Sequence, residues 1–250
     1  MSSAGHNEID RTRPVRLGIL DAVPARYMLP GERTDPEKFI NLFRAVNARI
    51  DFQVFEPTRL HYPDRLEECD AYLLTGSPCS AYEPLNWIPP LEAFVRQAYG
   101  AGVPLVGICF GHQLIAQALG GKVEKAASGW VLGMHEFGIV GSRPWMSDAA
   151  GSHALHFINQ DQVVRMPPGV ELYASSSDCP VVMYGVEGRL LCLQGHPEQA
   201  ESSMRAFTAK LQDLDLIDEQ QARTALASMQ GRRPDAERVG RWISAFLGAG

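Results

Sequence analysis

The residues best suited to chemistry in this chain surround one cysteine, in the stretch Gly107-Ile108-Cys109-Phe110-Gly111. A short apolar run ends just before the cysteine and apolar residues at helical spacing follow it, which predicts a strand, a sharp turn and a helix. The two glycines allow strand and helix to approach closely, as in a nucleophile elbow. The helix N-terminus would place partial positive charge near the sulfur, which stabilises a thiolate and a nearby oxyanion. The stretch therefore predicts a nucleophilic thiol.

A base and a group to orient it are present in Gly195-His196-Pro197-Glu198, directly after a predicted strand. Pro197 favours an extended conformation for His196, and residues two apart on an extended chain point to the same side. Glu198 would hold one imidazole nitrogen while the other faces the sulfur of Cys109. Alone, such a tripeptide is more typical of a surface turn. Together with the elbow it supplies the three roles of a thiol triad, so we predict Cys109, His196 and Glu198 as the catalytic residues.

A third turn, Gly76-Ser77-Pro78, follows a predicted strand over residues 71–75. In open parallel sheets ligands gather outside the carboxyl ends of the strands, so this turn and the elbow are expected to face one crevice. A backbone N–H at Ser77 would there bind an oxyanion. The alternative interpretation is an ordinary Gly-Pro turn.

The elements that position these residues indicate an α/β fold. Helices predicted from residue 35 and over 87–99 separate the early strands, which implies right-handed parallel crossovers and a sheet covered on both faces. The later strands are expected to be antiparallel in part. We therefore predict a mixed, largely parallel central sheet with helices on both faces. The predicted strands cover residues 15–20, 51–56, 71–75, 105–108, 133–140, 170–175, 181–186 and 190–194.

The chain has 250 residues and 45% apolar content, enough for one large domain. We expect a frayed tail over residues 1–14, the catalytic domain over 15–200, and a helical extension over 201–250 that packs on the same domain. The last apolar stripe, which includes Trp242, is alternatively a docking surface for a partner. The long connection over residues 22–35 is interpreted either as a lid or as an ordinary strand-to-helix loop.

Composition narrows the choice of function. A net charge of −6 without a compensating basic run argues against nucleic-acid or anionic-membrane partners and favours a small-molecule substrate. An apolar membrane span and a secretory signal are not evident, so a cytoplasmic protein is expected. The five cysteines lack paired zinc-ligand spacing, and His135, His153 and His156 lack the helical spacing of metal ligands. We predict no disulfide framework, no metal and no cofactor.

Taken together, the three motifs resemble the class I glutamine amidotransferases, and among them the stand-alone branch with GMP-synthase-like amidotransferases and gamma-glutamyl peptidases. The resemblance spans roughly residues 15–200. It implies a flavodoxin-like architecture with a mixed seven-stranded sheet. It also implies that the cysteine attacks the side-chain amide of glutamine, ammonia leaves, and water releases glutamate from a gamma-glutamyl thioester. Cys109, His196 and Glu198 match the triad of the family.

The same resemblance assigns further roles. The N–H groups of Ser77 and Phe110 would form the oxyanion hole, Gly76 would allow close backbone approach, and Gln113 would help to hold the substrate. Trp130 is a candidate for substrate specificity or a partly buried aromatic residue.

The chain also departs from the family pattern. Asn159 stands where relatives often have a histidine, which affects substrate specificity. Residues 120–123 do not form a phosphate-binding loop, so any acceptor of ammonia would be a separate synthetase. Free glutamine and a gamma-glutamyl peptide are both candidate substrates.

Two alternative hypotheses place the chain in a different functional class. One is a non-catalytic regulatory or binding relative that has the fold, and the other is the group of cysteine-elbow chaperones and deglycase-like proteins. The intact triad argues against the first, and the His-Pro-Glu segment on a late strand argues against the second.

Overall fold

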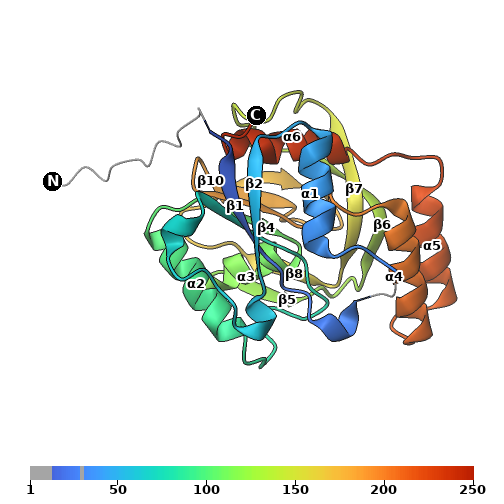
Figure 1. Cartoon of the computed structure of the whole chain (residues 1–250). Helices are drawn as coiled ribbons and strands as arrows, with labels where there is room; N and C mark the ends of the chain where they lie inside the picture. The colour runs from blue at the N-terminus through green and yellow to red at the C-terminus, as the bar shows by residue number, and fades with distance from the viewer. Residues whose placement is uncertain (1–12, 29–30) are drawn as a thin grey trace.

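A computed structural model describes residues 13–28 and 31–250 of the chain (Figure 1). The tail predicted over residues 1–14 lies outside the described residues up to position 12. Within the described part, no helix is both long and apolar enough to cross a membrane.

Nine strands of the described residues form one mixed sheet, in the order β2-β1-β3-β4-β11-β10-β9-β6-β7. The parallel part consists of β2 (Ile50–Phe55), β1 (Val15–Leu20), β3 (Ala71–Leu74), β4 (Leu105–Ile108) and β11 (Leu190–Leu193). The antiparallel part consists of β10 (Met183–Val186), β9 (Glu171–Ser175), β6 (Val131–Ile139) and β7 (Ser152–Asn159). A separate ribbon pairs β5 (Lys122–Lys125) with β8 (Asp161–Arg165). The predicted α/β fold with a mixed sheet is confirmed, with nine strands where the resemblance implied seven.

Helices cover both faces of the parallel part because successive side chains of each strand point to opposite sides. On β3, Leu73 belongs to the core beneath α1 (Asp35–Ala45) and α6 (Ala236–Phe246), whereas Leu74 belongs to the core beneath α2 (Ile88–Gly100) and α3 (Phe110–Ala118). Three short 3-10 turns complete this region, at Ala25–Tyr27, Pro57–Arg59 and Leu66–Glu68.

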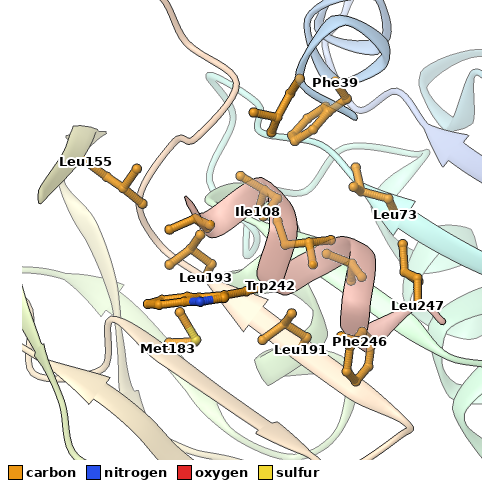
Figure 2. Close-up of a cluster of buried hydrophobic side chains, with 14 of the residues drawn as sticks. Phe39, Leu73, Ile108, Leu155, Met183, Leu191, Leu193, Trp242, Phe246 and Leu247 are labelled. Atoms are coloured by element: carbon orange, nitrogen blue, oxygen red, sulfur yellow. The ribbon is translucent and has the colours of Figure 1, made fainter. Parts of the chain in front are cut away.

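The last helix packs directly behind the strands that carry the predicted catalytic residues. Figure 2 shows Trp242 and Phe246 of α6 among side chains of β4 and β11, including Ile108 and Leu193. The Trp242 indole is 1% exposed, and its Nε1 donates a hydrogen bond of 2.6 Å to the carbonyl of Ser147. This helix therefore belongs to the main core.

The other two C-terminal helices, α4 (Glu201–Asp213) and α5 (Glu219–Met229), lie at the β6–β7 end of the sheet (Figure 1). Their core is a smaller apolar cluster that includes Met204, Ile217 and Ala225. Gly133 of β6 allows α5 to approach: it has a φ of +99°, and a Cβ there would lie 2.7 Å from the carbonyl oxygen of Ala225.

Three strands were not predicted, namely β5, β7 and β8. The alternation that marks a half-buried strand is missing from β7, because residues 153–157 are all buried. The antiparallel part of the sheet is therefore larger than the sequence indicated.

Candidate active site

Cys109 occupies the turn between β4 and α3, as predicted. Its backbone has φ +52° and ψ −106°, a strained conformation for a residue other than glycine. Its amide donates a 2.8 Å hydrogen bond to the carbonyl of Leu193 on β11. The glycines are needed for close packing: a Cβ on Gly111 would lie 2.5 Å from the carbonyl oxygen of Leu74, and one on Gly107 2.7 Å from the backbone of Gly111.

His196 reaches the elbow because β11 is paired in parallel with β4, so that both strands end at the same edge. The amide of His196 donates to the carbonyl of His156 on β7 at 2.8 Å, which holds the segment after β11 extended. Nδ1 of His196 lies 2.6 Å from Oε1 of Glu198, whose side chain is fully buried. The structure thus joins the predicted base and its predicted orienting group.

The charge state of His196 is set by its neighbours. Burial lowers its pKa, but the Glu198 carboxylate and Cys109 outweigh this and raise the pKa well above the ordinary histidine value. Since Nδ1 is engaged with Glu198, Nε2 is the ring nitrogen left for exchange with the thiol. An imidazolium is therefore stabilised next to Cys109.

The Gly76 turn packs against both groups. A Cβ on Gly76 would lie 3.2 Å from Cε1 of His196 and 3.7 Å from Cβ of Cys109. The turn is fastened to α3 by a 3.1 Å hydrogen bond from the Gly111 amide to the carbonyl of Thr75. Ser77 follows at this edge, and its Oγ accepts a 3.3 Å hydrogen bond from the amide of Cys79.

Phe110 begins α3, where the first amides of a helix have no acceptor within it. The N–H groups of Ser77 and Phe110 are thus both at the edge where Cys109 lies, and their role as an oxyanion hole stays a prediction.

Gln113 is buried in a polar cluster. Its Nε2 donates to the carbonyl of Asp161 at 2.8 Å and to Oε1 of Gln194 at 2.9 Å. Nδ2 of Asn159, the residue that departs from the family pattern, donates at 3.1 Å to the same Asp161 carbonyl. Because both amide hydrogens of Gln113 are used within the protein, the predicted substrate contact would come from its Oε1.

The sequence analysis missed a polar group on the first turn of α1. Oδ1 of Asp35 lies 3.2 Å from Nζ of Lys38 and 3.4 Å from Nε2 of Gln199. Its Oδ2 is 3.8 Å from the position that a Cβ on Gly76 would take. In the sequence, these residues appear only as opposite charges three positions apart at the start of a helix, a common pattern that does not indicate a functional site.

Two other predicted features have defined partners. Nε1 of Trp130 donates to the carbonyl of Leu216 at 3.1 Å, so its polar edge is occupied by the α4–α5 connection. In the loop before α1, Glu32 accepts a 2.6 Å hydrogen bond from Ser203 of α4. Across the described residues, no group of three or more His, Cys, Asp or Glu side chains is arranged to hold a metal ion.

Comparison with known proteins gives consistent results. The family model described as "Glutamine amidotransferase class-I" matches residues 40–212. Gamma-glutamyl peptidase 3 of Arabidopsis thaliana is 29% identical over 182 residues, which are 70% of this chain and 73% of the relative. Gamma-glutamyl peptidase 4 of the same plant is 31% identical over 68% of this chain and 70% of its own length.

A GMP synthase of Aromatoleum aromaticum is 33% identical over half of this chain, but this match covers only 25% of the relative. Among solved structures, a glutamine amidotransferase of Thermotoga maritima superposes with a TM-score of 0.73 at 18% identity, over 93% of this chain and 98% of the other. The structural match supports the fold.

Proposed function

The chain belongs to the class I glutamine amidotransferase family, and from this premise we propose that it hydrolyses a gamma-glutamyl amide through a thioester on Cys109. The observation that carries the proposal is the 2.6 Å contact of His196 with Glu198, placed by β11 beside a strained cysteine elbow on β4. A nucleophile, a base and a buried group that orients the base are what acyl transfer requires.

In the proposed reaction, Nε2 of His196 already holds the proton taken from the thiol, and the Cys109 sulfur attacks the gamma-carbonyl carbon as a thiolate. The N–H groups of Ser77 and Phe110 stabilise the oxyanion that forms. Collapse breaks the C–N bond, and the leaving amine takes the proton from His196. A water molecule then gives a proton to His196 and attacks the thioester carbonyl. The C–S bond breaks, glutamate is released, and the thiolate is restored beside the imidazolium. Glu198 holds Nδ1 throughout and stabilises the imidazolium.

The substrate is proposed to be a gamma-glutamyl peptide, with free glutamine as the second candidate. The two Arabidopsis relatives, which carry peptidase names, match over about 70% of both chains, which favours the peptide. The GMP synthase match favours glutamine, with ammonia passed to a separate synthetase. Action in the cytoplasm, and the lack of nucleic-acid and membrane partners, stay predictions.

The first experiment is intact-mass spectrometry after treatment with a chloroketone analogue of glutamine. We expect one adduct on the wild-type protein and on Cys79→Ala, and none on Cys109→Ala, because Cys79 is an equally buried thiol outside the triad. Glutamate release from glutamine and from gamma-glutamyl dipeptides would then rank the two substrates. An adduct that persists on Cys109→Ala refutes the nucleophile, and a folded wild-type protein without any adduct favours the non-catalytic alternative.

A further inference from the structure

Asp35 and Lys38 form an ion pair that is almost closed off from water. Their side chains are 11% and 8% exposed, and Oδ1 of Asp35 lies 3.2 Å from the ammonium nitrogen of Lys38. The ammonium group also lies 5.4 Å from the ring centre of Phe207 on α4. Thr34 caps the helix just before the pair, which fixes the position of Asp35 as the first helical residue.

Asp35, the acidic member of the pair, faces the candidate active site on two sides. Oδ2 of Asp35 and Cε1 of His196 lie 3.8 Å and 3.2 Å from one point, the position of a Cβ on Gly76. On the other side, Oδ1 of Asp35 accepts a 3.4 Å hydrogen bond from Gln199, the residue that follows Glu198. The carboxylate of Asp35 thus packs behind the Gly76 turn and against the segment that carries His196.

Stability does not account for these charges. Taking two opposite charges out of water costs about as much as their attraction returns, and buried pairs are often replaced by apolar residues without loss. Lys38 also stands in the first turn of α1, where the helix dipole disfavours a cation. The Asp35–Lys38 ion pair is better explained by a role towards the neighbouring Gly76 turn and Gln199 segment.

We propose that Asp35 and Lys38 are positioning residues for the reaction of Cys109: Asp35 holds the Gly76 turn and the Gln199 segment, and Lys38 balances its charge beside His196 and Glu198. The inference rests on the proposed function, because it assigns these residues a role in that reaction. Without Lys38, the site would hold two buried carboxylates, Asp35 and Glu198, close to one imidazole.

The charged and titratable groups around the site come from several elements. They are Asp21 after β1, Asp35 and Lys38 on α1, Cys109 at the elbow, His156 on β7, and Glu198 and Glu201 before and in α4. Burial raises the pKa of Asp35, Lys38 opposes this, and the charge of Glu198 adds to it. Lys38 is thus the largest influence that favours the ionised form of Asp35, and His196 adds a smaller one.

The test is the rate at which Cys109 is alkylated by iodoacetamide between pH 5 and 10, measured by intact mass with Cys109→Ala as the blank. Asp35→Asn retains the shape of the side chain but leaves Lys38 uncompensated, which favours the thiolate. We expect its pH profile to shift to lower pH by about one unit, the order of magnitude by which a nearby charge shifts a pKa. In Asp35→Asn/Lys38→Met the charge balance returns, and the profile should move back towards that of the wild type.

Asp51→Asn, on the exposed edge of β2, is the control and should leave the profile unchanged. A purely structural role would lower the melting temperature of Asp35→Asn without moving the profile, and that result overturns the inference. The inference is also overturned if the pH profile of Asp35→Asn/Lys38→Met is the same as that of Asp35→Asn. If the wild-type thiol is not alkylated faster than in the unfolded protein at neutral pH, the proposed function fails as well, which separates the two failures.

Discussion

At the scale of single residues, the site contains a backbone conformation and a buried charge that are unfavourable by themselves. Cys109 adopts a backbone geometry that costs a residue other than glycine about 1–3 kcal/mol, and Glu198 is a carboxylate without exposed surface. Cys109 is held by a long-range hydrogen bond to Leu193, and Glu198 contacts His196, whose own amide is held by His156 on the distant strand β7. The reactive geometry is therefore a property of the folded chain and does not exist in isolated segments.

The raised pKa of His196 has a consequence for stability. A histidine whose pKa is higher in the folded state stabilises that state fully below its unfolded pKa of about 6.5, and this contribution is lost as pH rises through the folded pKa. Glu198→Gln removes the larger of the two influences that raise the pKa of His196. We expect the melting temperature of the wild type to exceed that of Glu198→Gln most at pH 6, and the gap to narrow towards pH 10.

Thermal unfolding followed by circular dichroism at pH 6, 7, 8, 9 and 10 measures the gap. Glu237→Gln, on the exposed side of α6, serves as the control and should show a constant difference from the wild type. A Glu198→Gln gap that does not change with pH would contradict the assigned charge state of His196.

At the scale of elements, α6 supports the active edge from behind. Trp242 packs with β4 and β11, the two strands that end at Cys109 and before His196. We expect Trp242→Ala to lower the free energy of unfolding by about 3–5 kcal/mol, the usual cost of removing a buried tryptophan. Urea denaturation measures the loss, and Arg241→Ala on the exposed side of α6 should change it by less than about 0.5 kcal/mol. A loss below about 1 kcal/mol for Trp242→Ala would contradict the packing role.

Some elements of the fold could be predicted from the sequence, and others could not. The elbow was predictable because its signal is local: two glycines flank Cys109 at the end of an apolar run. The grouping of the Gly76 turn with Cys109 followed from the rule that parallel strands end at one edge, and His196 was added because a base and its orienting group complete a thiol triad. The strand β7 was missed because burial on both faces removes alternation.

Asp35 and Gln199, by contrast, are separated by 164 positions, and nothing near either residue signals their contact. The same holds for the partners of Gln113, since Asp161 and Gln194 come from different strands or strand ends. These side-chain contacts depend on how the distant segments pack in three dimensions, which the local sequence does not encode.

At the scale of the whole molecule, the structure contains cores of unequal size. The cluster beneath α4 and α5 is much smaller than the two that sandwich the parallel strands. We expect the opening that allows deuterium exchange to cost less free energy at the amides of α5 than at the amides of β4. Fewer apolar groups hold α5 in place. Native-state exchange read by mass spectrometry at increasing urea measures both.

Ile217→Ala offers a matched perturbation, since Ile217 is buried only in the small cluster. It should lower the protection of α5 and leave β4 unchanged. Equal protection of α5 and β4 in the wild type would show that the molecule opens as one unit.

The position of β11 in the sheet sets when Cys109 and His196 can come together. This strand lies between β4 and β10, yet it enters the chain more than 80 residues after β4. During synthesis the cysteine elbow emerges long before the histidine strand, so the nascent thiol has no base beside it. The pairing of β11 with β4 joins segments far apart in the sequence, and pairings of this kind tend to form slowly. On the proposed function, the pairing of β11 with β4 therefore completes the site, and a chain cut short before β11 would carry the thiol without its base.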